Sequence, residues 1–491
     1  MNSLQKFIEN KTSSIKNSGF IISNVAKISY HEFEKKVKNT SSYLKNKGID
    51  EGDNVAIISE NHPDFILLVF ALWKIKAVPV PINVKLLSKE IEEQIKFADC
   101  RFVLINKNIS VSLNHISIKD RIISFPFNAE PLENTPGKKF NENDTALILF
   151  TSGSSGKSKA VVLSFTNLIN SNSIGNQILK QNKNDRWLAS LPFYHIGGFS
   201  IIIRTFLTGS SVIIPDSLKN EDLIKAIKKY TPTLASFVST QLQRLLEKNI
   251  EPNKELKNVL IGGGFTSDKL SMEAIKKGWK ITKVYGSTEV SSFVSAISVK
   301  EILKKPSSCG KALTPNEILV INEKKENVPA NTRGEVIVKS PSVTKGYYKN
   351  PEETGRKLIN HFYYTGDIGY LDTEGYLFVE ARREDLIISG GENITPKEVE
   401  STILIHPSIE DVFVFGLDDY EWGQEAAAAV VLKKNEEINS DELKKFLKNK
   451  LAGYKIPRKI FFIDEIPKTS LGKVQKEKLF KLIRMHNSPS S

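Results

Sequence analysis

The stretch TALILFTSGSSGKSKAVVLS, residues 145–164, places a short apolar run directly before a loop of glycine, serine and lysine. Residues 146–150 predict a buried strand, and Thr151 to Lys159 form the loop. A loop of this kind can turn several backbone N–H groups and hydroxyls towards one point, which suits a chain of phosphates. The stretch therefore predicts an α/β protein with a phosphate-binding loop at this strand.

Two common phosphate motifs do not describe the loop. The P-loop, G-x-x-x-x-G-K-[ST], fits at Gly156 and Lys157, but Thr151 stands at its leading glycine position. The Rossmann pattern G-x-G-x-x-G begins at Gly262 but has Ser267 at its third glycine position. Taken alone, the loop is also compatible with an exposed Ser/Gly segment that binds nothing.

The chain around the loop alternates helical and strand-like patterns. Residues 28–48 have helical spacing, short apolar runs near residues 55 and 103 predict strands, and further runs near residues 188, 213, 235, 260 and 283 precede Gly, Ser or Pro turns. This rhythm indicates a parallel sheet with crossover helices. Because ligands bind outside the carboxyl ends of such strands, these turns are candidate site loops.

The pattern changes towards the C-terminus. From about Pro329 the sequence predicts short antiparallel strands. After Asp385 it predicts a compact α+β pattern, which opens with a helix over residues 392–407 (ENITPKEVESTILIHP). The predicted fold is therefore α/β, with a large N-terminal domain (residues 1–383) of parallel-sheet βαβ subdomains plus a small β-barrel-like part. A small mobile α+β domain follows at residues 384–491.

Composition excludes several classes of protein. The longest apolar run stops at Lys74, short of the roughly 20 residues that a membrane helix needs. Two cysteines give no disulfide framework and no metal cluster, so we expect a cytoplasmic protein without a membrane span. The net charge of +13 comes from lysines mixed with glutamates along helices, which is not typical of a nucleic-acid binder. No motif indicates whether the chain forms a homo-oligomer.

Four further motifs follow the loop in a fixed order. They are Tyr285-Gly286-Ser287-Thr288-Glu289, Tyr364-Thr365-Gly366-Asp367, Arg382 before Ile388-Ser389-Gly390-Gly391-Glu392-Asn393, and Pro467-Lys468-Thr469-Ser470-Leu471-Gly472-Lys473. Together with the loop, they resemble the adenylate-forming superfamily of acyl-CoA synthetases, luciferases and peptide-synthetase adenylation domains. Two departures, Ser158 for a frequent Pro and Ala381 for a frequent Gly, leave every charged participant in place.

The resemblance implies two half-reactions that use ATP, Mg²⁺ and coenzyme A. A small-molecule carboxylic acid attacks the α-phosphorus of ATP, and a thiol then attacks the acyl-adenylate. The first step concentrates negative charge and needs cations and oriented donors. The implied catalytic residues are Lys473, Thr288, Glu289 and His195, with Glu289 as the metal ligand. The implied ATP and AMP contacts are Thr151, Ser152, Gly153, Ser154, Ser155, Gly156, Lys159, Gly262, Gly263, Gly264, Tyr285, Gly286, Thr288, Asp367 and Arg382.

The resemblance also assigns residues to the second half-reaction. It implies that Ser389, Gly390 and Gly391 face coenzyme A, and that the small domain rotates about a hinge at Glu384 and Asp385. Each assignment has a structural alternative.

Those alternatives arise from ordinary roles of the same residue types. Lys473 also fits a solvated lysine in a lysine-rich segment, Asp367 a tight turn, and Thr288 a helix cap. His195 also fits a structural histidine on a turn.

Arg204 bears on the choice of acid. It interrupts the apolar segment FSIIIRTFLTG, where a buried cation is costly unless it meets an anion. The anion is either an internal Asp or Glu or a second carboxylate on the substrate, so His195 and Arg204 are the candidate acid contacts. Segments such as RREDLIISGGENITPKEVE also resemble the subgroup that serves menaquinone and phylloquinone biosynthesis, which implies o-succinylbenzoate as the acid.

Other functions remain open at this stage. A medium-chain fatty or aryl acyl-CoA synthetase would have the same motifs, but its substrate would not require Arg204. An adenylating module that loads a carrier protein would differ in the thiol that it uses. A nucleotide-binding regulator without activity is disfavoured because Glu289, Asp367, Arg382 and Lys473 are all present.

Overall fold

The structure is a computed structural model of the chain. It describes residues 4, 18–114, 118–127, 139, 141–151, 158–264, 266, 268–381, 387–394, 396–467, 474 and 476–486. The described residues form a large unit up to Ala381 and a small unit from Ile387 onwards, which also includes Lys85–Leu87 and Ser158. Within these ranges, no helix combines the length and the apolar character that crossing a membrane requires.

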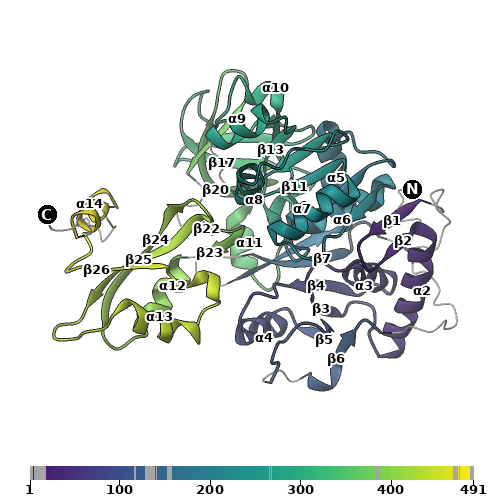
Figure 1. Cartoon of the computed structure of the whole chain (residues 1–491), viewed down its shortest axis with the longest axis horizontal. Coiled ribbons are helices and arrows are strands. Elements are labelled where there is room, and N and C mark those ends of the chain that lie inside the picture. Colours follow the sequence, from purple (N-terminus) through teal and green to yellow (C-terminus); the bar gives the residue numbers. More distant parts are fainter. Residues whose placement is uncertain are drawn as a thin grey trace. The chain divides into compact units, whose positions relative to one another are not determined.

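One sheet of the large unit is parallel and has four strands. Its order is β4 (Val78–Ile82), β3 (Asn54–Ile58), β5 (Cys100–Asn106) and β6 (Ile122–Phe125), and helices α2 (Tyr30–Asn46), α3 (Pro63–Lys74) and α4 (Ser88–Phe97) connect or cover it. A capping box between Ser29 and Glu32 starts α2. Pro63 at the first turn of α3 needs no backbone donor there. The crossover pattern predicted from the sequence is confirmed here (Figure 1).

The second sheet has nine strands. Its order is β15 (Lys311–Ala312), β14 (Ser295–Ser298), β13 (Ile281–Tyr285), β12 (Asn258–Ile261), β11 (Leu234–Phe237), β9 (Arg186–Leu188), β10 (Ser211–Ile213), β1 (Gly19–Ile22) and β2 (Lys27–Ser29). The strands from β13 to β1 run parallel, and the edges are antiparallel. The parallel strands therefore end at one shared edge.

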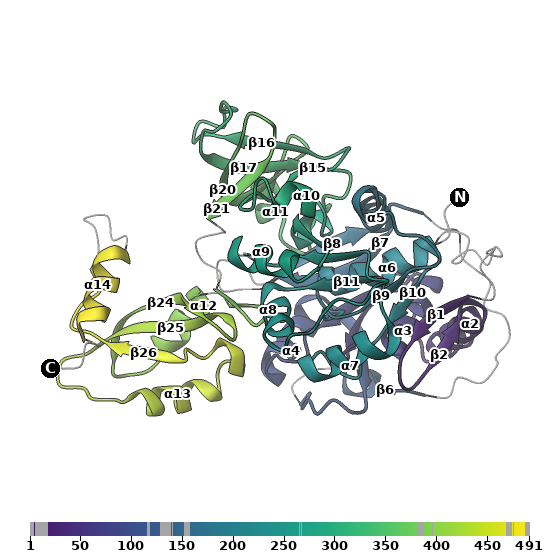
Figure 2. The ribbon, with the colours of Figure 1, turned by 45° about the horizontal axis from the view of Figure 1, so that its top comes forward.

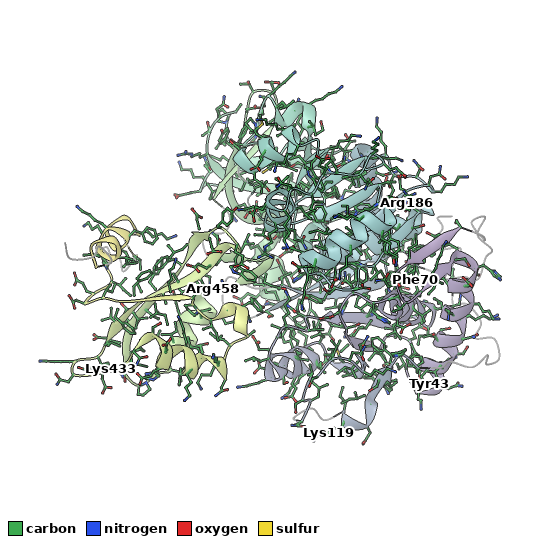
Figure 3. All side chains as sticks on the ribbon, viewed as in Figure 1. Tyr43, Phe70, Lys119, Arg186, Lys433 and Arg458 are labelled. Carbon is green, nitrogen blue, oxygen red and sulfur yellow. The ribbon has the colours of Figure 1, made fainter. Side chains whose placement is uncertain are left out.

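Both faces of this sheet are covered by helices (Figure 2). Alternate strand residues face opposite cores, as Trp187 and Leu188 show. The core on the Trp187 face includes α5 (Phe165–Leu179) and α6 (Ile196–Thr208), and Phe70 of α3 joins it (Figure 3). The opposite core includes α7 (Asn220–Tyr230), α8 (Ser239–Glu247) and α9 (Asp268–Lys276). Helices α5 and α6 thus lie in an apolar layer against the sheet.

Two antiparallel sheets complete the large unit. The part expected to be barrel-like is a five-stranded sheet of β16 (Glu317–Ile321), β17 (Gly334–Lys339), β20 (Phe362–Leu371), β19 (Leu358–Ile359) and β21 (Leu377–Ala381). A three-stranded sheet joins β18 (Gly346–Tyr347), β8 (Lys159–Ser164) and β7 (Thr145–Thr151). The short helices are α10 (Val299–Ile302), α11 (Pro351–Lys357), η1 (Lys119–Arg121) and η2 (Thr288–Val290). The glycine-rich segment therefore connects two paired antiparallel strands, β7 and β8.

The small unit is an α+β layer. Its sheet contains β23 (Glu392–Ile394), β22 (Ile387–Ser389), β25 (Gly423–Leu432), β24 (Ile409–Asp419) and β26 (Lys459–Phe462), with α12 (Pro396–Ile403), α13 (Ser440–Lys448), η3 (Gly453–Lys455) and α14 (Lys476–His486). One expectation needs correction, because the helix predicted from Glu392 starts only at Pro396. Residues 392–394 pair with β22 instead, and Pro396 then opens the helix at a position where its missing N–H costs nothing. The α/β class with large and small parts is confirmed.

Candidate active site

The candidate site loops lie at the carboxyl edge of the nine-stranded sheet. Gly262, Gly263 and Gly264 directly follow β12, and Gly286 follows β13. A Cβ added to Gly262 would lie 2.7 Å from Val284 Cγ2, so the backbone passes close to the neighbouring strand. The predicted gathering of turns at one edge of a parallel sheet is confirmed for these residues.

Tyr285 and Asp367 form a hydrogen-bonded pair. The Tyr285 hydroxyl donates to Asp367 Oδ2 at 2.6 Å, although the two residues lie on different sheets. Burial, followed by the charge of Asp367, raises the pKa of Tyr285 well above its usual value, so the hydroxyl stays protonated and remains a donor. Asp367 is further held by its N–H, which donates to Thr365 Oγ1 at 2.9 Å. The Tyr285 hydroxyl therefore holds the carboxylate, and the second hydrogen bond holds the backbone that carries it.

The segment after Tyr285 is a tight loop that carries Glu289. A Cβ added to Gly286 would lie 1.9 Å from the carbonyl oxygen of Ser292, so only glycine fits there. Glu289 is 2% exposed, and the Tyr347 hydroxyl donates to its Oε1 at 3.0 Å. Ser287 Oγ is buried and lacks a hydrogen-bond partner among the described residues. The loop therefore presents oxygen atoms, the ligands that Mg²⁺ prefers.

No metal cage surrounds this loop within the described parts of the chain. No group of three or more His, Cys, Asp or Glu residues is placed to hold an ion there. A single carboxylate is nevertheless adequate for Mg²⁺ that is bound mainly through substrate phosphates and water. The residues present thus fit a magnesium ion that arrives with a nucleotide.

Lys159 takes part in a partly buried ion pair. Its Nζ lies 2.5 Å from Glu353 Oε1, and it also lies over the ring of Tyr347 at 5.7 Å. Burial alone would raise the pKa of Glu353, but hydrogen bonds from Arg356 and Lys159 outweigh it and lower the pKa to about 2. The ion pair of Lys159 thus links the start of β8 to α11. Lys159 is also the register partner of Thr151 between β8 and β7.

His195 stands at the N-cap of α6, directly after the segment Leu191–Tyr194. Asn61, which follows β3, fixes this segment from the side. Its Nδ2 donates to the carbonyls of Ala189 (3.1 Å) and Leu191 (2.8 Å), and its Oδ1 accepts from the N–H of Phe193 (2.8 Å). Asn61 was not predicted from the sequence, because a lone Asn between a strand and a helix has no distinguishing pattern.

Arg204 is buried inside α6, and no acidic side chain of the described residues pairs with it. It is 2% exposed, and its guanidinium carbon lies 4.5 Å from the ring centre of Phe293 and 5.7 Å from that of Trp187. Its Nε and Nη2 are buried and have no hydrogen-bond partner among the described residues. Burial lowers the pKa of Arg204 to about 9, which leaves the guanidinium charged at neutral pH. Two anions were considered for Arg204, an internal Asp or Glu and a second carboxylate on the substrate. No Asp or Glu among the described residues forms an ion pair with it.

The small unit contains a glycine hairpin with an aromatic neighbour. Gly390 and Gly391, with φ of 57° and 84°, turn between the paired residues Ser389 and Glu392. A Cβ on Gly390 would lie 2.7 Å from Trp422 Cε3, and the N–H of Gly390 donates to the Trp422 carbonyl at 2.8 Å. Trp422 was not predicted as a site residue from the sequence.

Arg458 stacks on the same tryptophan. Its guanidinium carbon lies 4.4 Å from the Trp422 ring centre, and Figure 3 labels Arg458 in the small unit. A planar cation on an aromatic face keeps its N–H groups available at its edge. The small unit therefore places a cation, an indole and two glycines together.

Several predicted site residues lie outside the described residues, so the structure says nothing about them. They are Ser152, Gly153, Ser154, Ser155, Gly156, Arg382, Glu384, Asp385 and Lys473.

Comparison with known families identifies the class. Residues 10–348 match the AMP-binding enzyme family, and residues 398–473 match the AMP-binding enzyme C-terminal domain. The chain therefore belongs to the AMP-binding enzyme family, as the ordered motifs predicted.

Individual relatives are more specific. The chain is 35% identical over 465 residues to a 2-succinylbenzoate–CoA ligase of Geobacillus sp. (strain WCH70), covering 93% of each chain. It is similar to a double mutant of o-succinylbenzoate CoA synthetase from Bacillus subtilis bound with a product analogue, with 29% identity, a TM-score of 0.90 and 98% coverage of both chains. The same Bacillus subtilis enzyme in complex with ATP and magnesium ion gives 29% identity and a TM-score of 0.72, covering 98% of this chain and 99% of that one.

Proposed function

We propose that the chain is an AMP-forming acid–CoA ligase that activates 2-succinylbenzoate. One carboxylate of the acid attacks the α-phosphorus of ATP, which forms the acyl-adenylate and releases pyrophosphate. The thiol of coenzyme A then attacks the acyl carbon, which forms the thioester and releases AMP. The product would serve menaquinone or phylloquinone biosynthesis, and the supply of ATP and coenzyme A places the reaction in the cytoplasm.

The observation that carries this proposal is the unpartnered edge of Arg204. Nε and Nη2 lie on one side of a guanidinium and bind the two oxygens of a carboxylate together. In the described structure both atoms are buried without a partner. A monocarboxylic acid spends its only carboxylate on the reaction, whereas 2-succinylbenzoate has a second one that can neutralise this buried cation. The proposal therefore explains a charge that a fatty-acid ligase would not need.

The large unit also supplies residues for the nucleotide. We assign Asp367, held by Tyr285 at 2.6 Å, to the ribose hydroxyls, because an ionised carboxylate accepts hydrogen bonds only. The glycines after β12 leave room for a flat base, and Thr288 with Ser287 offers hydroxyls to the phosphates. Glu289 would hold magnesium, whose chemistry is to neutralise charge on the phosphates. In the proposed site Arg382 adds a ribose contact, and Lys473 supplies the cation between the attacking carboxylate and the phosphate.

For the second step, we assign the glycine hairpin of the small unit to coenzyme A. Gly390 and Gly391 have no side chains to obstruct a narrow pantetheine arm, and Ser389 precedes them. The Arg458 guanidinium on Trp422 offers a cation and an aromatic surface beside that turn. A polyanionic nucleotide group with a flat base suits such a pair. Glu384 and Asp385 remain our proposed hinge.

The deciding experiment measures pyrophosphate release with ATP and Mg²⁺ for single acids, with and without coenzyme A. We expect strong release with 2-succinylbenzoate and little with benzoate, octanoate or palmitate. Release with the monocarboxylates instead would support the alternative, a medium-chain fatty or aryl acyl-CoA synthetase. Replacing coenzyme A by a carrier protein in the thioester assay would test the third candidate.

A further inference from the structure

Gly175 occupies a position that helix propensity does not explain. It is buried in the interior of α5, where glycine is less favourable than alanine. A Cβ added there would lie 3.0 Å from both Cδ2 and Cε2 of Phe293, closer than ordinary van der Waals contact. Phe293 is fully buried, so its ring has no open solvent into which to move. The absence of a side chain at Gly175 therefore makes room for this ring.

Phe293 in turn is the aromatic side chain closest to the unpartnered guanidinium. Its ring centre lies 4.5 Å from Arg204 Cζ, against 5.7 Å for Trp187. A guanidinium over an aromatic face is attracted to it and keeps its in-plane N–H groups for other ligands. The position of the Phe293 ring thus bears directly on the direction in which Nε and Nη2 point.

We propose that Gly175 and Phe293 are positioning residues that determine acid specificity. Gly175 leaves the space that Phe293 fills, and Phe293 fixes the plane in which Arg204 presents Nε and Nη2 to the second carboxylate of the acid. This inference rests on the proposed function, because it requires a dicarboxylic substrate. Since the contact involves neither the nucleotide nor the thiol, its loss changes recognition of the acid alone.

The test compares Gly175→Ala and Phe293→Val with the wild type. The acids are 2-succinylbenzoate and its two monocarboxylate analogues, 4-oxo-4-phenylbutanoate and 2-butanoylbenzoate, and the analogue that the wild type turns over serves as reference. Because small misplacements of binding groups are costly, we expect each variant to raise KM for 2-succinylbenzoate by roughly ten- to a hundredfold. KM for ATP and KM for the reference analogue should stay unchanged.

Gly355→Ala is the matched control. Gly355 also lies in a helix, α11, and an added Cβ there meets nothing within 4 Å, so this variant should behave as the wild type. The double variant Gly175→Ala/Phe293→Val tests the coupling. Phe293→Val removes both ring atoms that the new Cβ would meet, so Gly175→Ala should add nothing further in that background.

The outcomes separate the two hypotheses. A wild type that does not turn over 2-succinylbenzoate overturns the proposed function. A wild type that does, with variants whose KM rises equally for both acids or whose effects simply add, overturns this inference alone. If Gly175→Ala does not fold, recovery of the fold in the double variant supports the contact. The ratio of KM for 2-succinylbenzoate to KM for the reference analogue, measured for Phe293→Val, then decides whether the ring positions Arg204.

Discussion

Replacing Arg204 by methionine should stabilise the ligand-free protein and at the same time lower its activity with the dicarboxylic acid. Methionine is unbranched and fills a similar channel without charge or N–H groups. Two buried donors of Arg204 have no partner among the residues that the structure describes, and each such donor costs about 1–3 kcal/mol in the ligand-free protein. The rings of Phe293 and Trp187 return roughly 0.5–2 kcal/mol through cation–π attraction. The two donors together cost about 2–6 kcal/mol, so after this offset we expect Arg204→Met to raise the free energy of unfolding of the ligand-free protein by a few kcal/mol, at most roughly 5.

The same change should cripple use of the dicarboxylate. Two charge-assisted hydrogen bonds at about 1.5–3 kcal/mol each amount to roughly 3–6 kcal/mol. At about 1.36 kcal/mol per factor of ten, kcat/KM for 2-succinylbenzoate should fall roughly 10²- to 10⁴-fold. Activation of a monocarboxylate, measured by the same pyrophosphate release, should be unchanged or improved.

Arg204→Lys provides the matched control for charge. Lysine keeps the positive charge but loses the planar two-donor edge, so it should recover only a small part of the activity. Thermal unfolding of the ligand-free proteins gives the stability comparison. If Arg204→Met unfolds at a lower temperature and loses all acids in parallel, the guanidinium is a structural group and the reasoning is wrong.

Three further changes test other parts of the site. Lys473→Ala should abolish pyrophosphate release yet preserve thioester formation from a supplied acyl-adenylate; undiminished release would disprove the role of this lysine. Tyr285→Phe removes the 2.6 Å hydrogen bond to Asp367 and should raise KM for ATP about three- to thirtyfold, with KM for the acid unchanged. Glu353→Gln removes a carboxylate whose folded-state pKa, about 2, lies below the ordinary 4.5. Its contribution to stability, about 3 kcal/mol at most, is present above pH 4.5 and is lost as pH falls towards 2, so urea unfolding of the wild type and variant should converge in acid. A constant difference between them from pH 7 to pH 2.5 would contradict the ion pair with Lys159.

Sequence patterns predicted the elements of this fold wherever local chemistry decides them. The run that became β7 and the turns after β12 and β13 carry their own signals, namely apolar period and glycine. The start of α12 was misplaced because Glu392–Ile394 joins β22, and pairing with a distant strand has no trace in a helical pattern. At these residues, pairing with β22 outweighed the helical preference of the local sequence.

The candidate site also contains residues that the sequence could indicate and residues that it could not. The charged candidate residues, such as Glu289 and Asp367, stand in ordered motifs, so their chemical type can be seen in the sequence. Asn61 was not, because its role depends on three backbone groups that lie about 130 residues away. Sequence alone left two explanations for Arg204, and the packing around α6 adds that no carboxylate of the described residues pairs with it.

Arg204 also shows why such a site cannot be optimised for stability and specificity together. An internal carboxylate would neutralise the cation and lower its cost in the free protein, but it would then compete with the substrate for the same edge. In the proposed site, Nε and Nη2, which have no partner among the described residues, keep that cost in the ligand-free state, and binding of a second carboxylate would relieve it. An acid without that carboxylate would leave the buried donors unsatisfied and should therefore be a poorer substrate. Discrimination of this kind depends on the surrounding layer remaining dry and closely packed, which is what the fully buried Phe293, Trp187 and Phe199 provide.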